Sequence, residues 1–290
     1  MASRFTARVK ETPQSEQYRL DLIAGLTHEL IPLKSVDAAI EALPPSSKVS
    51  VTCSPVKGID TTIELTDRIR AAGHMAIPHI SARMVEDADH VARIAAWLRT
   101  EDVGTMFLVG GDADPPGAYP DAISFLRDLL DADPGLRTIG VTAYPDSHPL
   151  IDTDVLHEAL HAKQALLAEA GVAGYASTQM CFDSGKIVSW LERERAAGLT
   201  LPIHLGVAGV VDRSKLMTMG VRLGIGSSLR YLKKNRNAIG RLLTSASFDP
   251  NKLLVPLSPH LEPLAVEGLH CFTFNQVDAT VSWQKRVLES

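Results

Sequence analysis

The chain has 290 residues and a mass of 31.3 kDa, with 45% hydrophobic residues, 22% charged residues and a net charge of −5. This length fits one large α/β barrel or two modest domains, and the composition is ordinary for a globular protein. The apolar runs end well short of the ~20 residues that a membrane span requires, and the dispersed basic residues do not indicate a nucleic-acid interface.

Residues 1–17 mix basic and acidic side chains without an apolar segment, which is unlike a secretory signal, so we expect a cytoplasmic protein. The three cysteines, Cys53, Cys181 and Cys271, are too few and too scattered for a disulfide framework. We expect free and mostly buried thiols.

Short apolar runs alternate with longer amphipathic stretches along the chain. The short runs predict strands at residues 26–31, 49–52, 75–80, 106–109, 138–142, 175–179, 202–207 and 269–274. The stretches between them have the apolar spacing of helices and include residues 61–72, 88–99, 122–130, 156–170, 186–197 and 215–223. This strict alternation predicts βαβ units and one parallel sheet.

Eight such units favour a closed barrel over an open, doubly wound sheet. We therefore predict an α/β protein with a single (βα)8 TIM barrel at residues 26–290, preceded by an N-terminal extension at residues 1–25. The extra length lies at residues 224–263, with helices expected at residues 229–243 and 250–261. Without strands of its own, this segment is predicted to add helices between the seventh and eighth strands and not a second domain.

The catalytic groups of a barrel lie at the C-terminal ends of its strands, so polar residues there are candidate site residues. Glu29 follows the first strand, where an ionised carboxylate is costly to bury unless it is paired. A raised pKa would suit Glu29 to general-acid chemistry, whereas pairing with an arginine would make it structural. His79, at the end of the third strand, is either a core histidine or a ligand contact.

The residues that follow the fourth and sixth strands are also candidate site residues. The fourth strand runs into Gly110-Gly111-Asp112, where glycine permits close backbone approach and the carboxylate either lies at the barrel mouth or caps the next helix. Gln179, after the sixth strand, offers both a donor and an acceptor, which suits the amide edge of a heterocycle. The sequence has no cluster at metal-ligand spacing, no phosphate-binding lysine loop and no nucleophile elbow, so no metal is expected.

In order along the chain, these strand ends resemble those of the methylenetetrahydrofolate reductase family, from about residue 26 to residue 283. The matching residues are Glu29, Val49-Ser50-Val51-Thr52, Pro78-His79, Gly111-Asp112 with Pro115-Pro116-Gly117, Tyr144-Pro145 with His148-Pro149, Thr178-Gln179 with Phe182-Asp183, and Phe272-Thr273-Phe274-Asn275. Each motif alone is weak, but the ordered set is specific. The resemblance implies an oxidoreductase of one-carbon and methionine metabolism that passes a hydride from NADH or NADPH, usually through bound FAD, to 5,10-methylenetetrahydrofolate, giving 5-methyltetrahydrofolate.

The resemblance also implies roles for individual residues. Glu29 would protonate N10 of the folate, Asp112 would hold the pterin ring and set the flavin's electronics, and Gln179 would bind the pterin amide edge. These three residues would be catalytic, and Phe182 and Asn275 would join them in binding the substrate. The cofactor would lie against Thr52, His79, Gly111, Asp112, Tyr144, His148 and Lys163.

Two departures from the family pattern concern the cofactor. Gly110 stands where a basic residue is usual. The helix before the sixth strand offers only Lys163 for the flavin diphosphate, and Lys163 is displaced by more than a turn relative to Gln179. The sequence therefore leaves two versions open: FAD held mainly by its ring and ribityl chain, which the retained contacts favour, or direct hydride transfer from NADH to folate.

Two other functions remain as alternatives. One is a pterin-dependent methyltransferase barrel, which would need no nicotinamide, and the other is a folate-binding barrel without activity. The expected partners are small molecules, folate and nicotinamide, with no nucleic acid and no membrane, and the sequence leaves a homo-oligomer open.

Overall fold

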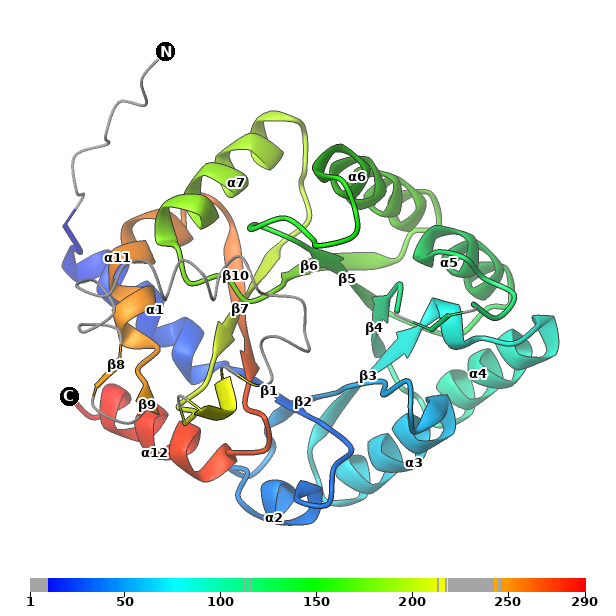
Figure 1. Cartoon of the computed structure of the whole chain (residues 1–290), viewed down its shortest axis with the longest axis horizontal. Coiled ribbons are helices and arrows are strands. Elements are labelled where there is room, and N and C mark those ends of the chain that lie inside the picture. The colour runs from blue at the N-terminus through cyan, green and yellow to red at the C-terminus, as the bar shows by residue number, and fades with distance from the viewer. Residues whose placement is uncertain are drawn as a thin grey trace.

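The computed structural model describes residues 10–111, 113–114, 116–212, 214–216, 218, 243–244 and 247–290. Eight parallel strands close into a barrel in the order β1-β10-β7-β6-β5-β4-β3-β2, with helices around the outside (Figure 1). The predicted (βα)8 TIM barrel is therefore confirmed.

Each predicted strand overlaps an observed one. The barrel strands are β1 (Thr27–Leu30), β2 (Lys48–Val51), β3 (Met75–Ser81), β4 (Thr105–Val109), β5 (Thr138–Ala143), β6 (Ala173–Thr178), β7 (Ile203–Ala208) and β10 (Val266–Phe272). The helices are α1 (Pro13–Ala24), α2 (Val36–Glu41), α3 (Gly58–Ala71), α4 (Ala88–Thr100), α5 (Ala122–Asp131), α6 (Thr153–Glu169), α7 (Ser184–Ala196), α11 (Asn251–Leu261) and α12 (Val277–Leu288), with a short 3-10 turn, η1 (Ala82–Met84).

The helix α1 lies within the residues predicted as an N-terminal extension. It packs against α11 and α12, and the Tyr18 hydroxyl donates a 3.0 Å hydrogen bond to the carbonyl of Val266 at the start of β10. Thr12 and Ser15 form a reciprocal capping box at its first turn. The sequence reasoning did not single out α1, α2 or α12.

The crossover between β7 and β10 differs from the prediction. The predicted helix at residues 250–261 is present as α11, but the segment also contains an antiparallel hairpin, β8 (Leu243–Thr244) with β9 (Ser247–Phe248), where no strand was expected. Strands of two residues are too short for an alternating pattern to reveal them in the sequence.

Two predicted helices in this crossover are largely outside the described residues. Of the helix expected at residues 229–243, only Leu243 is described, and it belongs to β8. Of the helix expected at residues 215–223, residues 215, 216 and 218 are described, and all three are helical.

Aspartates define where several outer helices begin. The side chain of Asp87 accepts from the backbone of His90 at α4, Asp121 caps α5 in the same way, and Asp183 accepts from Gly185 and Lys186 at α7. Such caps satisfy backbone donors that have no partner within the helix. Among the described residues, no helix has the length and apolar character needed to cross a membrane.

Aromatic rings fill the inside of the barrel below its mouth. The ring of His204 stacks on Tyr175 with centroids 4.0 Å apart, and Phe107 lies 6.2 Å from Tyr175 and 4.7 Å from His79. A Cβ at Gly140 would lie 2.3 Å from the Tyr175 ring, so glycine is what leaves room for it. Burial raises the pKa of Tyr175 and, together with the neighbouring His270, lowers that of His204 to about 4, so this layer is uncharged at neutral pH.

Candidate active site

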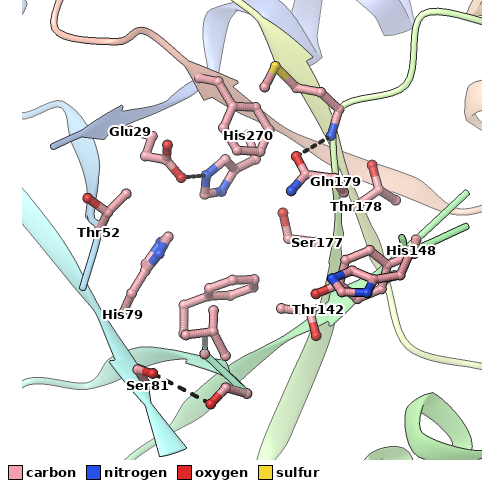
Figure 2. Close-up of a pocket in the computed structure, with 18 of the residues that line it drawn as sticks. Glu29, Thr52, His79, Ser81, Thr142, His148, Ser177, Thr178, Gln179 and His270 are labelled. Carbon is pink, nitrogen blue, oxygen red and sulfur yellow. Dashed lines mark hydrogen bonds and ion pairs between the residues drawn. The ribbon is translucent and has the colours of Figure 1, made fainter. Parts of the chain in front are cut away.

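A cavity of about 250 Å³ opens at the C-terminal ends of the strands, where barrel enzymes carry their active sites. Seven of the predicted site residues line it: Glu29, Thr52, His79, Gly111, Tyr144, His148 and Gln179. Glu29, Thr52 and His79 lie on one side of the cavity, and His148, Thr178 and Gln179 lie on the other (Figure 2). The fold therefore gathers residues that are far apart in the sequence around one space.

Glu29 is paired, and its partner is a histidine. Its Oε2 lies 3.0 Å from Nε2 of His270 on β10, and both side chains are buried. The hydroxyl of Thr273 donates a 2.6 Å hydrogen bond to the Glu29 carbonyl, and Ser50 Oγ lies 3.4 Å from His270 Nε2. A buried carboxylate needs such partners, and His270 supplies one from the neighbouring strand.

His79 and Thr52 carry polar atoms that lack partners. His79 Nε2 and Thr52 Oγ1 are buried, and neither forms a hydrogen bond within the described part of the chain. Burial, together with His270 nearby, lowers the pKa of His79 well below its ordinary range, so its imidazole is neutral. Buried polar atoms without partners are costly, and a ligand in this cavity would satisfy both of them.

Gln179 is oriented by the backbone beside it. Its Oε1 accepts a 2.8 Å hydrogen bond from the backbone of Met180, which leaves the amide nitrogen as a donor at the cavity wall. The preceding Thr178 is fixed in turn, because its hydroxyl accepts a 2.8 Å bond from the backbone of Gly206 on β7.

The loops after β4 and β5 form the mouth. Gly111 has a φ of +89°, and a Cβ there would lie 1.8 Å from Ser81 Oγ, so both conformation and space require glycine. The rings of Tyr144 and His148 meet edge to face, with centroids 5.3 Å apart. Asp146 lines the cavity beside them and forms an ion pair with Lys186.

The other predicted site residues lie elsewhere. The buried Lys163 packs against β5 with Nζ 3.4 Å from Thr142 Oγ1, and burial lowers its pKa to about 8. Phe182 is buried against the ring of Phe248, 5.3 Å away. Asn275 clamps the loop after β1, accepting from the backbone nitrogen of Ile31 and donating to its carbonyl, both at 2.9 Å. Asp112 is outside the described residues.

The sequence patterns did not single out His270 or Phe107, both of which line the cavity. Phe107 lies in the middle of β4 and His270 lies within β10, before the strand ends at which site residues are expected. Alternation along a strand was the available signal, because His270 and Phe272 are two residues apart and share a face.

The same cluster has donor atoms within reach of one ion. Ligand atoms of Glu29, His79 and His270 all lie within 4.8 Å of one another. These residues come from three different strands, so no spacing in the sequence could indicate the cluster. Their donor set could hold a divalent transition metal, although the Glu29–His270 pair is complete as an acid–base pair without one.

Comparisons with known proteins give distant relatives of one name and a likeness of fold. No family model matches the chain. Methylenetetrahydrofolate reductase 1 of Schizosaccharomyces pombe is 26% identical over 159 residues, which are 52% of this chain and 24% of that protein. Methylenetetrahydrofolate reductase 2 of Saccharomyces cerevisiae is 22% identical over 247 residues, which are 79% of this chain and 37% of that protein. The chain is similar to methylenetetrahydrofolate reductases.

The chain spans only about a quarter to a third of the length of these relatives. Among solved structures, a protein from Burkholderia cenocepacia J2315, named provisionally as a phosphonomutase, has a TM-score of 0.51 and 11% sequence identity. The match covers 95% of this chain and 98% of that one. At this identity the likeness concerns the fold alone.

Proposed function

We propose that the chain is an oxidoreductase that reduces 5,10-methylenetetrahydrofolate to 5-methyltetrahydrofolate with a hydride from NADH or NADPH. The observation that carries the proposal is the buried Glu29–His270 pair, which lines a cavity at the C-terminal ends of the strands. The likeness to two reductases of this name supports the choice of substrate.

In this proposal Glu29 supplies a proton. Protonation of N10 opens the five-membered ring of the folate and leaves an N5 iminium, whose methylene carbon then accepts the hydride. General-acid catalysis requires a proton donor positioned at the reacting nitrogen. Glu29 is placed for this role because it lines the cavity together with Phe107 and Phe272. Gln179 and His79 offer polar atoms to the edge of a flat heterocycle, and this positioning holds the donor and acceptor carbons together.

His270 positions Glu29 through the 3.0 Å contact between its Nε2 and Glu29 Oε2. We expect His270→Asn, which removes the imidazole beside the carboxylate, to lower kcat by less than the 10²- to 10⁴-fold of a lost general acid, at roughly unchanged KM. The pH profile of kcat should change as well, because the imidazole that contacts the carboxylate is removed. Steady-state kinetics across pH tests this, and a change in KM alone would assign His270 to substrate binding.

The cavity fits the ring of a flavin better than its diphosphate. Thr52, His79, Tyr144 and His148 line it, as the FAD version requires, and two of them carry polar atoms without partners. However, no lysine or arginine is among the described residues of the lining, and Lys163 is buried against Thr142. A flavin that stays bound needs charge-assisted contacts to its diphosphate more than a nicotinamide that leaves after each turnover does, so the described donor set favours direct transfer from the nicotinamide.

A spectrum of the purified protein separates the two versions. We expect NADH absorbance to fall on addition of methylenetetrahydrofolate while the protein itself shows no flavin band near ~450 nm. A yellow protein whose activity follows its flavin content would establish the FAD version. Methyl transfer from methyltetrahydrofolate without consumption of nicotinamide would instead support the methyltransferase alternative and contradict the proposal.

A further inference from the structure

A second group of titratable side chains lies on the outside of the barrel, between α6 and α7. These helices are neighbours in the ring of helices around the sheet (Figure 1). His157 and His161 are four residues apart on α6 and therefore share one face, and Glu194 comes from the last turn of α7. None of the three lines the cavity of the proposed active site.

The three side chains converge on one oxygen. Glu194 Oε2 lies 2.7 Å from Nδ1 of His157 and 3.2 Å from Nε2 of His161. The two imidazole rings are 4.4 Å apart, and donor atoms of all three residues lie within 4.8 Å of one another. Glu194 has a side-chain exposure of only 1%. A carboxylate is rarely buried between two surface helices, which makes the cluster unusual.

We propose that His157, His161 and Glu194 bind one divalent transition-metal ion of the Zn²⁺ type. Two imidazole nitrogens and one carboxylate oxygen are a donor set that zinc takes in proteins, with bonds of about 2.0–2.2 Å. Tetrahedral bonds of that length separate the ligand atoms by about 3.3 Å. The observed separations of 2.7 and 3.2 Å differ from this value by about 0.6 and 0.1 Å, and the two histidine nitrogens lie within 4.8 Å of each other.

The surroundings hold the carboxylate in place for this role. Arg193 Nη2 donates a 3.0 Å hydrogen bond to Glu194 Oε1, so an ion at Oε2 would replace only the contacts of Oε2 with the two histidines. Burial raises the pKa of Glu194, but the hydrogen bonds from His157, Arg193 and His161 outweigh it and lower the pKa, so the carboxylate is charged at neutral pH. Outer partners of this kind orient metal ligands and strengthen binding.

Hydrogen bonds join the same face of α6 to the residues that follow α7. Gln164 Oε1 accepts from the backbone of Thr200 at 2.7 Å and of Leu201 at 3.2 Å, one turn after His161. The helices therefore bring the ligands together before an ion arrives, which limits the ordering cost of binding. The side chains of His157 and His161 are 36% and 21% exposed, so an ion reaches them from solvent.

Calorimetric titration of the chelator-treated chain with Zn²⁺ tests the proposal. We expect one ion per chain, with binding weakened at least about tenfold in both His157→Gln and His161→Gln. His260→Gln, a histidine on α11 outside the cluster, is the matched control, and its affinity should equal that of the wild type. Thermal unfolding with and without Zn²⁺ gives a second measurement, because an ion that binds only the folded chain raises Tm.

Glu29→Gln separates this site from the cluster in the cavity, which also has metal-ligand geometry. Zinc binding should be unchanged in that variant, and its loss would place the ion in the barrel and overturn the proposal. The absence of binding in the wild-type chain would overturn it as well. Far-UV circular dichroism without metal identifies any variant that fails to fold, and His161→Asn then replaces it.

Discussion

Glu29→Gln is expected to lower kcat for methylenetetrahydrofolate reduction by about 10²- to 10⁴-fold, the contribution of a positioned general acid. Glutamine keeps the shape of the side chain and its hydrogen bond to His270, but it has no proton to give to the folate nitrogen. Folate binding should remain, because Gln179 and the partnerless His79 are untouched. Stopped-flow measurement of NADH oxidation gives the rate, and folate titration gives the affinity.

The matched control is Glu267→Gln, which makes the same exchange at an exposed glutamate on β10. Its kcat should equal that of the wild type. Turnover that survives in Glu29→Gln would remove Glu29 from the mechanism. A loss of folate binding together with activity would assign it to substrate positioning instead.

The barrel was predictable because each of its eight strands, and most of the helices between them, leaves a local signal. Buried strands read as short β-branched runs, and the outer helices repeat apolar residues every three to four positions. Glu29, His79 and Gln179 were found by the rule that sites lie at the C-terminal strand ends, and all three line the cavity. The β8–β9 hairpin left no such signal, since two residues per strand show no period.

Pairings across the fold were not predictable from local patterns. Glu29 and His270 are 241 residues apart in the sequence, and only the closure of β1 on β10 brings them together. The same closure places the Asn275 amide on the backbone of Ile31, a contact that no local pattern indicates. Local patterns identify individual residues, but they do not give the pairing of β1 with β10 that determines which side chains come into contact.

Gly206→Ala is expected to destabilise the barrel by about 3 kcal/mol, near the upper end for overpacking of a core. A Cβ at this position on β7 would lie 2.0 Å from the Thr178 carbonyl oxygen and 2.9 Å from the Phe272 ring. The carbonyl is backbone and has no rotamer to change, so β6 itself must shift. Thermal and urea unfolding measure the loss.

The shift also reaches the proposed site, because the Gly206 nitrogen donates to Thr178 Oγ1 and Gln179 follows directly. Activity in Gly206→Ala should therefore fall even at temperatures where the chain remains folded, with KM for folate rising. Gly25→Ala is the control, since its φ is −88° and a Cβ there comes no closer than 3.6 Å to a neighbour. An alanine at position 206 without effect on Tm would mean that β6 and β7 relax apart at this point, and Gln179 would then be held by its side-chain bond to Met180 and its backbone bond to Ala143.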